Sequence, residues 1–100
     1  MKITDLHATQ RKLNRAYQIP GLVKSIKNKE YVPPILLSEL EDGRIVVENG
    51  HHRLMSYYLA GRKELEDFEY VLVGEIPKNR SRVMKVEIWV RGIMAITPDS

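Results

Sequence analysis

The chain has 100 residues, no cysteine and a formal net charge of +3; 43% of its residues are hydrophobic and 29% are charged. These proportions are typical of one globular domain with a single core. The lack of cysteine excludes disulfides, thiolate metal ligands and cysteine nucleophiles. No stretch approaches the roughly 18 apolar residues of a membrane span, and the first residues lack a signal peptide's apolar segment, so we expect a cytoplasmic protein without a membrane partner.

Charge is unevenly distributed along the chain. Residues 1–29 hold seven Lys or Arg and one acid, whereas residues 64–75 hold five acids and no base. Residues 76–91 are basic again, with five Lys or Arg. Basic segments of this kind either form solvated faces or attract a polyanionic partner.

The first third of the chain predicts a strand and one amphipathic helix. Residues 2–7 alternate enough to predict a short first strand. Residues 8–17 predict a loop or short helix whose surface carries three bases, Arg11, Lys12 and Arg15. Apolar residues then recur at helical spacing, at Ile19, Leu22, Val23 and Ile26. We therefore expect a helix that ends near residues 28–29, with Pro20 tolerated in its first turn.

The middle of the chain predicts a β-hairpin followed by a helix. Residues 35–40 and 44–48 are strand-like apolar runs on either side of a turn that contains Asp-Gly. Residues 53–60 carry apolar side chains at helical spacing. Gly61 is expected to end that helix, because glycine adopts the left-handed conformation that commonly follows a helix.

The last third predicts two further strands. Residues 68–73 are rich in aromatic and β-branched side chains. Residues 83–90 alternate, which predicts a final strand with Trp89 on its solvated face, and residues 92–100 are expected to form a C-terminal tail. The sum is an α+β fold, a single small mixed-sheet domain over residues 1–91 with about five strands and two to three helices.

Candidate chemistry is concentrated in Gly50-His51-His52-Arg53, between the hairpin and the helix. A glycine allows a positive φ and a close ligand approach, and a helix start offers unpaired N–H groups and partial positive charge to an anion. Arg53 is suited to a forked contact with phosphate, and His52 to donating a hydrogen bond to it. The same residues also fit a tight turn in which the histidines cap the helix and Arg53 pairs with an acid, so spacing alone leaves both interpretations open.

Two other interpretations of the charged residues stay open. His51 and His52 are adjacent and point about 100° apart on a helix, so we expect no metal held by protein side chains alone. A divalent ion carried by a bound nucleotide fits better. A nucleic-acid surface would contact phosphates through basic residues and stack bases on aromatic ones, although Tyr58 also fits the core. Its members would be Arg11, Lys12, Arg15, Arg80 and Arg82, with Tyr57, Tyr58 or Trp89.

The run from Val32 through Gly50-His51-His52-Arg53-Leu54 to Gly61 resembles the ParB/sulfiredoxin fold. The hallmark of that fold is a strand, a Gly-Cys-His-Arg-like or Asp-Gly-His-His-Arg-like loop, and a helix that ends in glycine; the loop of this chain is closest to the second type. The resemblance implies that the loop binds the phosphates of ATP, ADP or CTP with Mg²⁺. By position, the phosphate-binding residues would be Gly50, His51, His52 and Arg53, assisted by Arg11.

Departures from the fold's members limit the chemistry that the resemblance implies. Sulfiredoxin needs a cysteine where His51 stands, so its activity is excluded. A free serine kinase of this fold has aspartate where Asn49 stands and a glutamate shortly after the first strand, whereas residues 8–16 contain no acid. A general base is therefore missing from its expected position, which leaves Glu48 and Glu30 as candidates. Chromosome-partitioning proteins carry two further domains, which we do not expect within 100 residues.

These observations predict a stand-alone domain, of a size that suits phage or plasmid proteins, that binds nucleotide phosphates at Gly50–Arg53. Whether it also has nucleoside triphosphatase activity stays open. A DNA-binding or ParB-like nuclease protein is the first alternative, because the first third of the chain is basic and Arg80 and Arg82 add to it. A small-molecule phosphotransferase that resembles the serine kinase is the second alternative.

Overall fold

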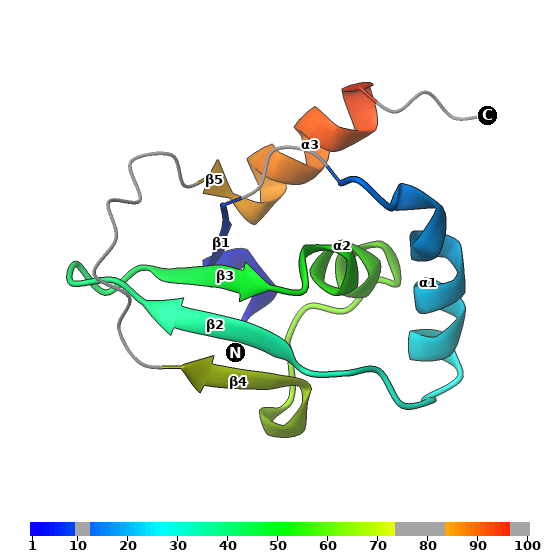
Figure 1. Cartoon of the computed structure of the whole chain (residues 1–100), viewed down its shortest axis with the longest axis horizontal. Helices are drawn as coiled ribbons and strands as arrows, with labels where there is room; N and C mark the ends of the chain where they lie inside the picture. Colours follow the sequence, from blue (N-terminus) through cyan, green and yellow to red (C-terminus); the bar gives the residue numbers. More distant parts are fainter. Residues whose placement is uncertain (10–12, 74–83, 97–100) are drawn as a thin grey trace.

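The computed structural model describes residues 1–9, 13–73 and 84–96 (Figure 1). Its strands are β1 (Leu6–Ala8), β2 (Ile35–Glu39), β3 (Ile45–Asn49), β4 (Tyr70–Val73) and β5 (Met84–Lys85). Its α-helices are α1 (Ile19–Lys27), α2 (His51–Leu59) and α3 (Val86–Ile96), and its short 3-10 helices are η1 (Ile3–Asp5), η2 (Ala16–Gln18) and η3 (Asp67–Glu69).

The described strands form one mixed sheet in the order β4-β2-β3-β1-β5. β2 and β3 form the predicted antiparallel hairpin, with Leu37 opposite Val47. β1 pairs with β3 and β4 pairs with β2 in parallel, whereas β5 is antiparallel to β1. The predicted α+β class is therefore confirmed. Because β1 and β3 run in the same direction, both end at the same edge of the sheet, where α2 begins (Figure 1).

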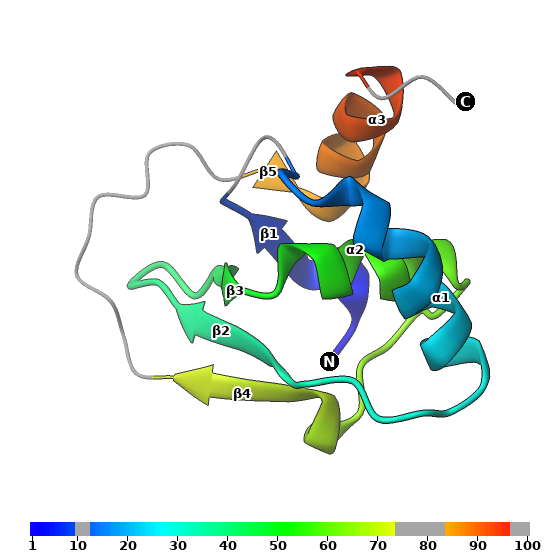
Figure 2. The same ribbon diagram turned by 45° about the vertical axis from the view of Figure 1, so that its right-hand side comes forward.

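The hydrophobic core joins the sheet to the helices and to the N-terminal segment. Figure 2 shows α1 alongside α2, and α3 beside β5 and β1. Burying each large apolar side chain contributes about 1.5–3 kcal/mol, so this core is the main source of stability. Its largest fully buried apolar side chains are Trp89, Ile3, Leu6, Ile35, Leu37, Leu54, Met55, Val47 and Val86. In the described part of the chain, none of the helices is long and apolar enough to cross a membrane.

The predicted final strand over residues 83–90 is wrong beyond Lys85, because α3 begins at Val86. The alternating pattern of this segment also contains the helical spacing of Val86, Trp89, Val90 and Ile93, and these side chains are the buried ones. Trp89 is 1% exposed and lies in the core instead of on a solvated face. α3 continues to Ile96, past the expected start of the tail, and residues 97–100 lie outside the described part.

Two predicted strands begin later than expected, because a 3-10 turn precedes each. η1 occupies residues 3–5 before β1, and η3 occupies residues 67–69 before β4. In η3 the side chains of Glu66 and Glu69 each accept a backbone N–H of the other residue, which is a capping box and favours the turn over an extended strand. The basic residues between β4 and β5 that the sequence singles out, Arg80 and Arg82, lie outside the described residues.

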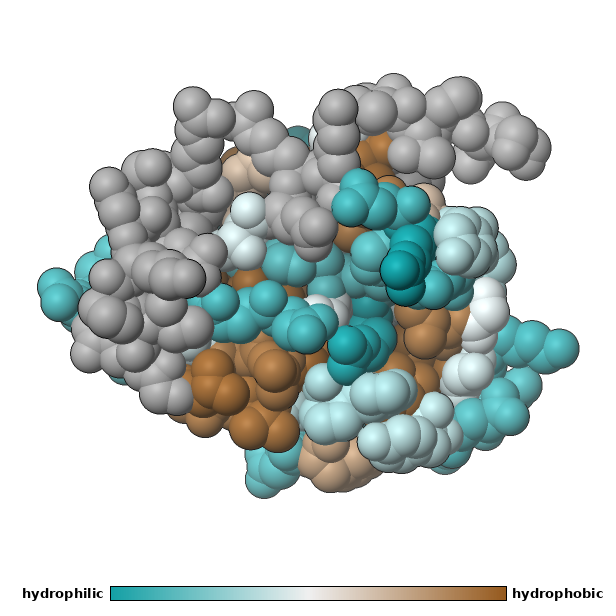
Figure 3. Space-filling view, viewed as in Figure 1, coloured by the Kyte–Doolittle hydropathy of each residue, from teal (hydrophilic) through white to brown (hydrophobic). Residues whose placement is uncertain are grey.

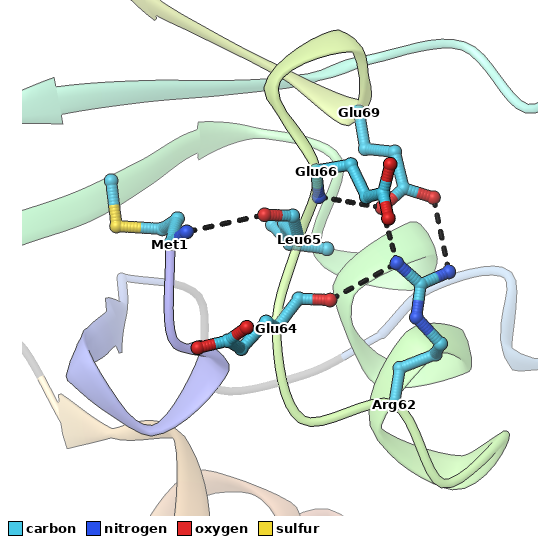
Figure 4. A network of polar contacts seen from close by, with 6 residues as sticks. All are labelled: Met1, Arg62, Glu64, Leu65, Glu66 and Glu69. Atoms are coloured by element: carbon cyan, nitrogen blue, oxygen red, sulfur yellow. Dashed lines mark hydrogen bonds and ion pairs between the residues drawn. The ribbon is translucent and has the colours of Figure 1, made fainter.

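A polar network fixes the end of α2 to η3 (Figure 4). The guanidinium of Arg62 donates to both carboxylate oxygens of Glu69. It also donates to the backbone carbonyl of Glu64 at 3.0 Å. Glu69 is 7% exposed; burial alone would raise the pKa of its carboxyl, but the hydrogen bonds from Arg62 and the backbone of Glu66 outweigh burial and lower it. Arg62 also lies 5.3 Å from the ring of Tyr57, a residue whose pKa burial and then the charge of Glu69 raise to about 12.

Candidate phosphate-binding site

Gly50 sets the start of α2. Its φ is +108°, in the left-handed region, and a Cβ at this position would lie 3.3 Å from backbone and side-chain atoms of Ile35. Only glycine meets both conditions without strain. The helix therefore begins at His51, two residues earlier than the sequence predicts, and no side chain caps its start. The first N–H groups of a helix have no partner inside the helix, so this end is available to an anion.

A cleft of about 430 Å³ opens at this helix start. One side of it is the turn itself, Gly50 to Arg53, together with Glu48 and Asn49. The other side comes from the segment before α1, from α1 and from the proline connector, through Asn14, Arg15, Gln18, Leu22 and Pro33. Four of the five predicted phosphate-binding residues therefore lie together at one cleft. The fifth, Arg11, lies outside the described residues, as do Lys12, Arg80 and Arg82.

His51 is buried and serves as a hydrogen-bond acceptor. Its Nε2 accepts the backbone N–H of Thr9 at 3.1 Å and lies 3.3 Å from the Thr9 hydroxyl oxygen, which in turn donates to the carbonyl of Val47. The ring packs edge-to-face against Trp89, with centroids 5.7 Å apart. Burial, and then the neighbouring His52, lower the pKa of His51 to about 4. At neutral pH the imidazole is therefore uncharged and able to accept.

His52 makes the same kind of contact with the segment before α1. Its Nε2 accepts the backbone N–H of Arg15 at 3.0 Å. Partial burial, and then the charges of Arg15 and Arg53, lower the pKa of His52. The two histidines thus hold Thr9 and Arg15, the two ends of the segment that precedes α1. Their Nε2 atoms position protein backbone, a role that the sequence did not predict.

Arg53 is oriented by backbone carbonyls. One guanidinium nitrogen donates to Pro33 at 3.1 Å and to Pro34 at 2.6 Å, and the other lies 3.4 Å from the side-chain oxygen of Asn49. These contacts tie α2 to the connector before β2 and keep a positive charge at the cleft. Arg15, which is exposed at the opposite wall, supplies a second one.

The two candidate catalytic acids lie in different places. Glu48 lines the cleft, and its carboxylate accepts the hydroxyl of the fully buried Ser38 at 2.9 Å. Glu30 lines a separate groove of about 550 Å³ between the end of α1 and η3. Of the two, Glu48 is the acid that the fold brings to the helix start.

Two aromatic residues of the expected nucleic-acid surface are not available for stacking. Tyr57 is 2% exposed and Trp89 is 1% exposed, so both belong to the core. Tyr58 is half-buried and packs against the core, in line with its alternative interpretation. The sequence missed Asn14, Gln18, Leu22 and Thr9 as members of the site, because their approach depends on tertiary packing. Among the described residues, no group of three or more His, Asp or Glu is placed to hold a metal ion.

Comparison with known proteins assigns the chain to a family. The family model of the ParB N-terminal domain matches residues 1–87, which is most of the chain. Searches of curated proteins and of solved structures found no match. The match agrees with the resemblance to the ParB/sulfiredoxin fold, and the chain therefore belongs to the ParB N-terminal domain family.

Proposed function

We propose that the cleft at the start of α2 binds the phosphate groups of a nucleotide. The observation that carries this proposal is the convergence of an uncapped helix start with two arginines, Arg15 and Arg53, at one cleft. A helix N-terminus favours negative charge, and arginine makes charge-assisted hydrogen bonds to phosphate oxygens. The cleft volume of about 430 Å³ lies within the range of small-molecule sites.

The wall opposite the helix start suits the remainder of a nucleotide. Leu22 and Pro33 offer apolar surface, on which a base or sugar ring packs. Asn14 and Gln18 offer amide groups that both donate and accept hydrogen bonds. This division into a charged end and an amide-bearing apolar end favours a nucleotide over inorganic phosphate.

Glu48 motivates the proposal that Mg²⁺ accompanies the nucleotide. It is the acid among the described residues that line the cleft, and carboxylates are the side chains that hold Mg²⁺ in proteins. Mg²⁺ in nucleotide sites is commonly held by one or two carboxylates together with substrate phosphates. Glu48 is also our candidate for a general base in phosphate hydrolysis, since Ser38 orients its carboxylate.

Calorimetric titration of ATP, ADP and CTP, each with Mg²⁺, tests the proposal. We expect at least one nucleotide to bind and Arg15→Ala to weaken it about 10- to 100-fold, because a charge-assisted contact to phosphate contributes about 1.5–3 kcal/mol. Arg15 holds His52 through its backbone N–H, so this variant keeps the wall in place. Arg91→Ala, which removes an exposed arginine of α3, is the matched control. No binding of any of the three nucleotides overturns the proposal.

DNA binding is the second candidate function. Family membership favours it, and α1 and the residue after its cap carry three exposed lysines, Lys24, Lys27 and Lys29. With Tyr57 and Trp89 buried, such binding would rest on phosphate contacts and would weaken steeply with salt. A gel-shift series from low to high salt tests this, with the three lysines changed together to glutamine as the comparison. An absent shift at low salt excludes it.

A further inference from the structure

The edge of the sheet formed by β4 lacks the protection that exposed strands usually carry. β4 is the terminal strand in the described sheet and pairs with β2 on one side. Its sequence, Tyr-Val-Leu-Val, contains no charge and no proline, the residues that commonly block pairing of an edge. Val71 is 45% exposed and Leu72 is 50% exposed. In Figure 3 the surface over β4 and β2 is a continuous hydrophobic area.

The residues that lead into β4 add an aromatic anchor and negative charge. Phe68 in η3 is 76% exposed and forms one wall of the groove of about 550 Å³, whose floor includes Tyr57 and Ile26. Glu66 and Asp67, beside it, are exposed acids. The whole segment from residue 64 to residue 75 contains five acids and no base. The bases that line the groove lie at the end of α1, at Lys27 and Lys29, and after α2, at Arg62, whose charge is paired with Glu69. A ligand that lies along β4 therefore meets apolar side chains with two exposed acids, Glu66 and Asp67, at their start.

We propose that the β4 edge, defined as Glu66, Asp67, Phe68, Val71 and Leu72, docks an extended basic polypeptide segment of a partner protein. An added strand takes its affinity from main-chain hydrogen bonds and its specificity from alternate side chains. Apolar side chains of the segment pack on Phe68, Val71 and Leu72, while its Lys or Arg side chains face Glu66 and Asp67. Charge argues against a second copy of the same edge, which would bring like charges together.

Synthetic peptides provide the probe. A nine-residue, end-capped peptide of alternating valine and lysine is titrated into ¹⁵N-labelled protein, and a valine–glutamate peptide of the same length is the charge-reversed control. We expect amide shifts at residues 68–72 with the lysine peptide, and at least about tenfold weaker binding of the glutamate peptide, because rim charges suppress the wrong partner. Equal binding of the two peptides, or shifts away from β4, overturns the proposal.

Substitutions separate the edge from general charge effects. Leu72→Lys places a like charge on the edge and should weaken the lysine peptide about tenfold, since it removes apolar contact as well. Ile88→Lys makes the same chemical change at a side chain of α3 that is 58% exposed, and should leave binding unchanged. Asp67→Lys, at an exposed position, should weaken binding about two- to fivefold, as expected for one exposed ion pair.

Two outcomes count against the proposal. If Ile88→Lys weakens binding of the lysine peptide as much as Leu72→Lys does, net charge and not the edge governs binding. Analytical ultracentrifugation of the free protein tests whether a second copy of the chain occupies the edge instead. A dimer that Leu72→Lys dissociates, without binding of the lysine peptide, assigns the edge to a second copy and overturns the proposal. Leu72 is half-exposed and Asp67 is exposed, so both variants should fold, and thermal melts should confirm this.

Discussion

The backbone N–H of Thr9 donates to Nε2 of His51 over 3.1 Å, and this bond joins the end of β1 to the first residue of α2. The parallel pairing of β1 with β3 makes the bond possible, because it brings the segment after β1 to the point where β3 enters the helix. Arg15 and His52 repeat the arrangement at 3.0 Å. Two imidazoles, which accept hydrogen bonds only while they are uncharged, thus hold the backbone at Thr9 and Arg15 beside the candidate cleft.

Acid should lower the free energy of unfolding through protonation of His51, and His51→Gln should remove the part of this loss that is due to His51. The pKa of His51 is about 4 in the folded protein and near 6.5 without burial, so the unfolded chain takes up a proton first. Stability from this group is present above pH 6.5 and is lost as the pH falls towards 4, by roughly 2–3 kcal/mol at pH 4.5. Urea unfolding at pH 7 and pH 4.5 measures the loss, which glutamine, a non-titrating acceptor, should reduce.

His52→Gln serves as the comparison for that experiment. Burial and the two neighbouring arginines lower the pKa of His52 as well, so this variant should also flatten the pH dependence, but less than His51→Gln because His52 is more exposed. If wild type and His51→Gln lose the same free energy of unfolding between the two pH values, His51 is not the group responsible.

Local rules predicted the parts of the fold whose signals are local. The Asp-Gly hairpin, α1 with its proline near the start, and Gly61 after α2, at a φ of +85°, follow from turn chemistry and periodicity. The hydrogen bonds that His51 and His52 accept could not be predicted from local rules, because their partners lie 42 and 37 positions away in the sequence. α3 was missed because its apolar residues satisfy both an alternating and a helical spacing, and burial of the helical set, Trp89 included, in the core decides between them.

Gly50→Ala should destabilise the protein and shift the start of α2. Alanine at a φ of +108° is strained, and its Cβ would lie 3.3 Å from Ile35, so we expect a loss of about 1–3 kcal/mol. Gly21→Ala is the matched control, since Gly21 lies within α1 and has open space around it. That change should stabilise by about 0.5–1 kcal/mol. Thermal unfolding compares the two; a stable Gly50→Ala protein would contradict the assigned backbone conformation.

Glu69→Gln should destabilise more than a corresponding change at an exposed ion pair. Glu69 is nearly buried and receives both guanidinium nitrogens of Arg62, so loss of its charge leaves that network without its counter-ion. We expect a loss of about 1–3 kcal/mol in urea unfolding at pH 7. The low pKa of Glu69 makes its contribution present above pH 4.5 and lost below it, so the difference between wild type and variant should shrink in acid.

Asp42→Asn provides the control for Glu69→Gln. Asp42 pairs with Arg44 at 2.7 Å in the exposed turn of the hairpin, where water screens the pair. The unfolding midpoint of this variant should equal that of wild type within error. Equal effects of the two substitutions would show that the Arg62–Glu69 contact does not anchor η3 to α2.

Asn49→Asp should change how the cleft responds to Mg²⁺. The side-chain oxygen of Asn49 lies 3.4 Å from Arg53, so aspartate there would form a charge-assisted contact and offset part of the positive charge that we propose attracts phosphate. In EDTA we expect ADP affinity to fall about two- to fivefold. With Mg²⁺ the loss should shrink, because a second carboxylate beside Glu48 offers the cation a ligand.

Asn28→Asp, after the far end of α1, is the control, because it makes the same charge change away from the cleft. If Asn28→Asp lowers affinity as much as Asn49→Asp, net charge explains the effect and the contact with Arg53 does not.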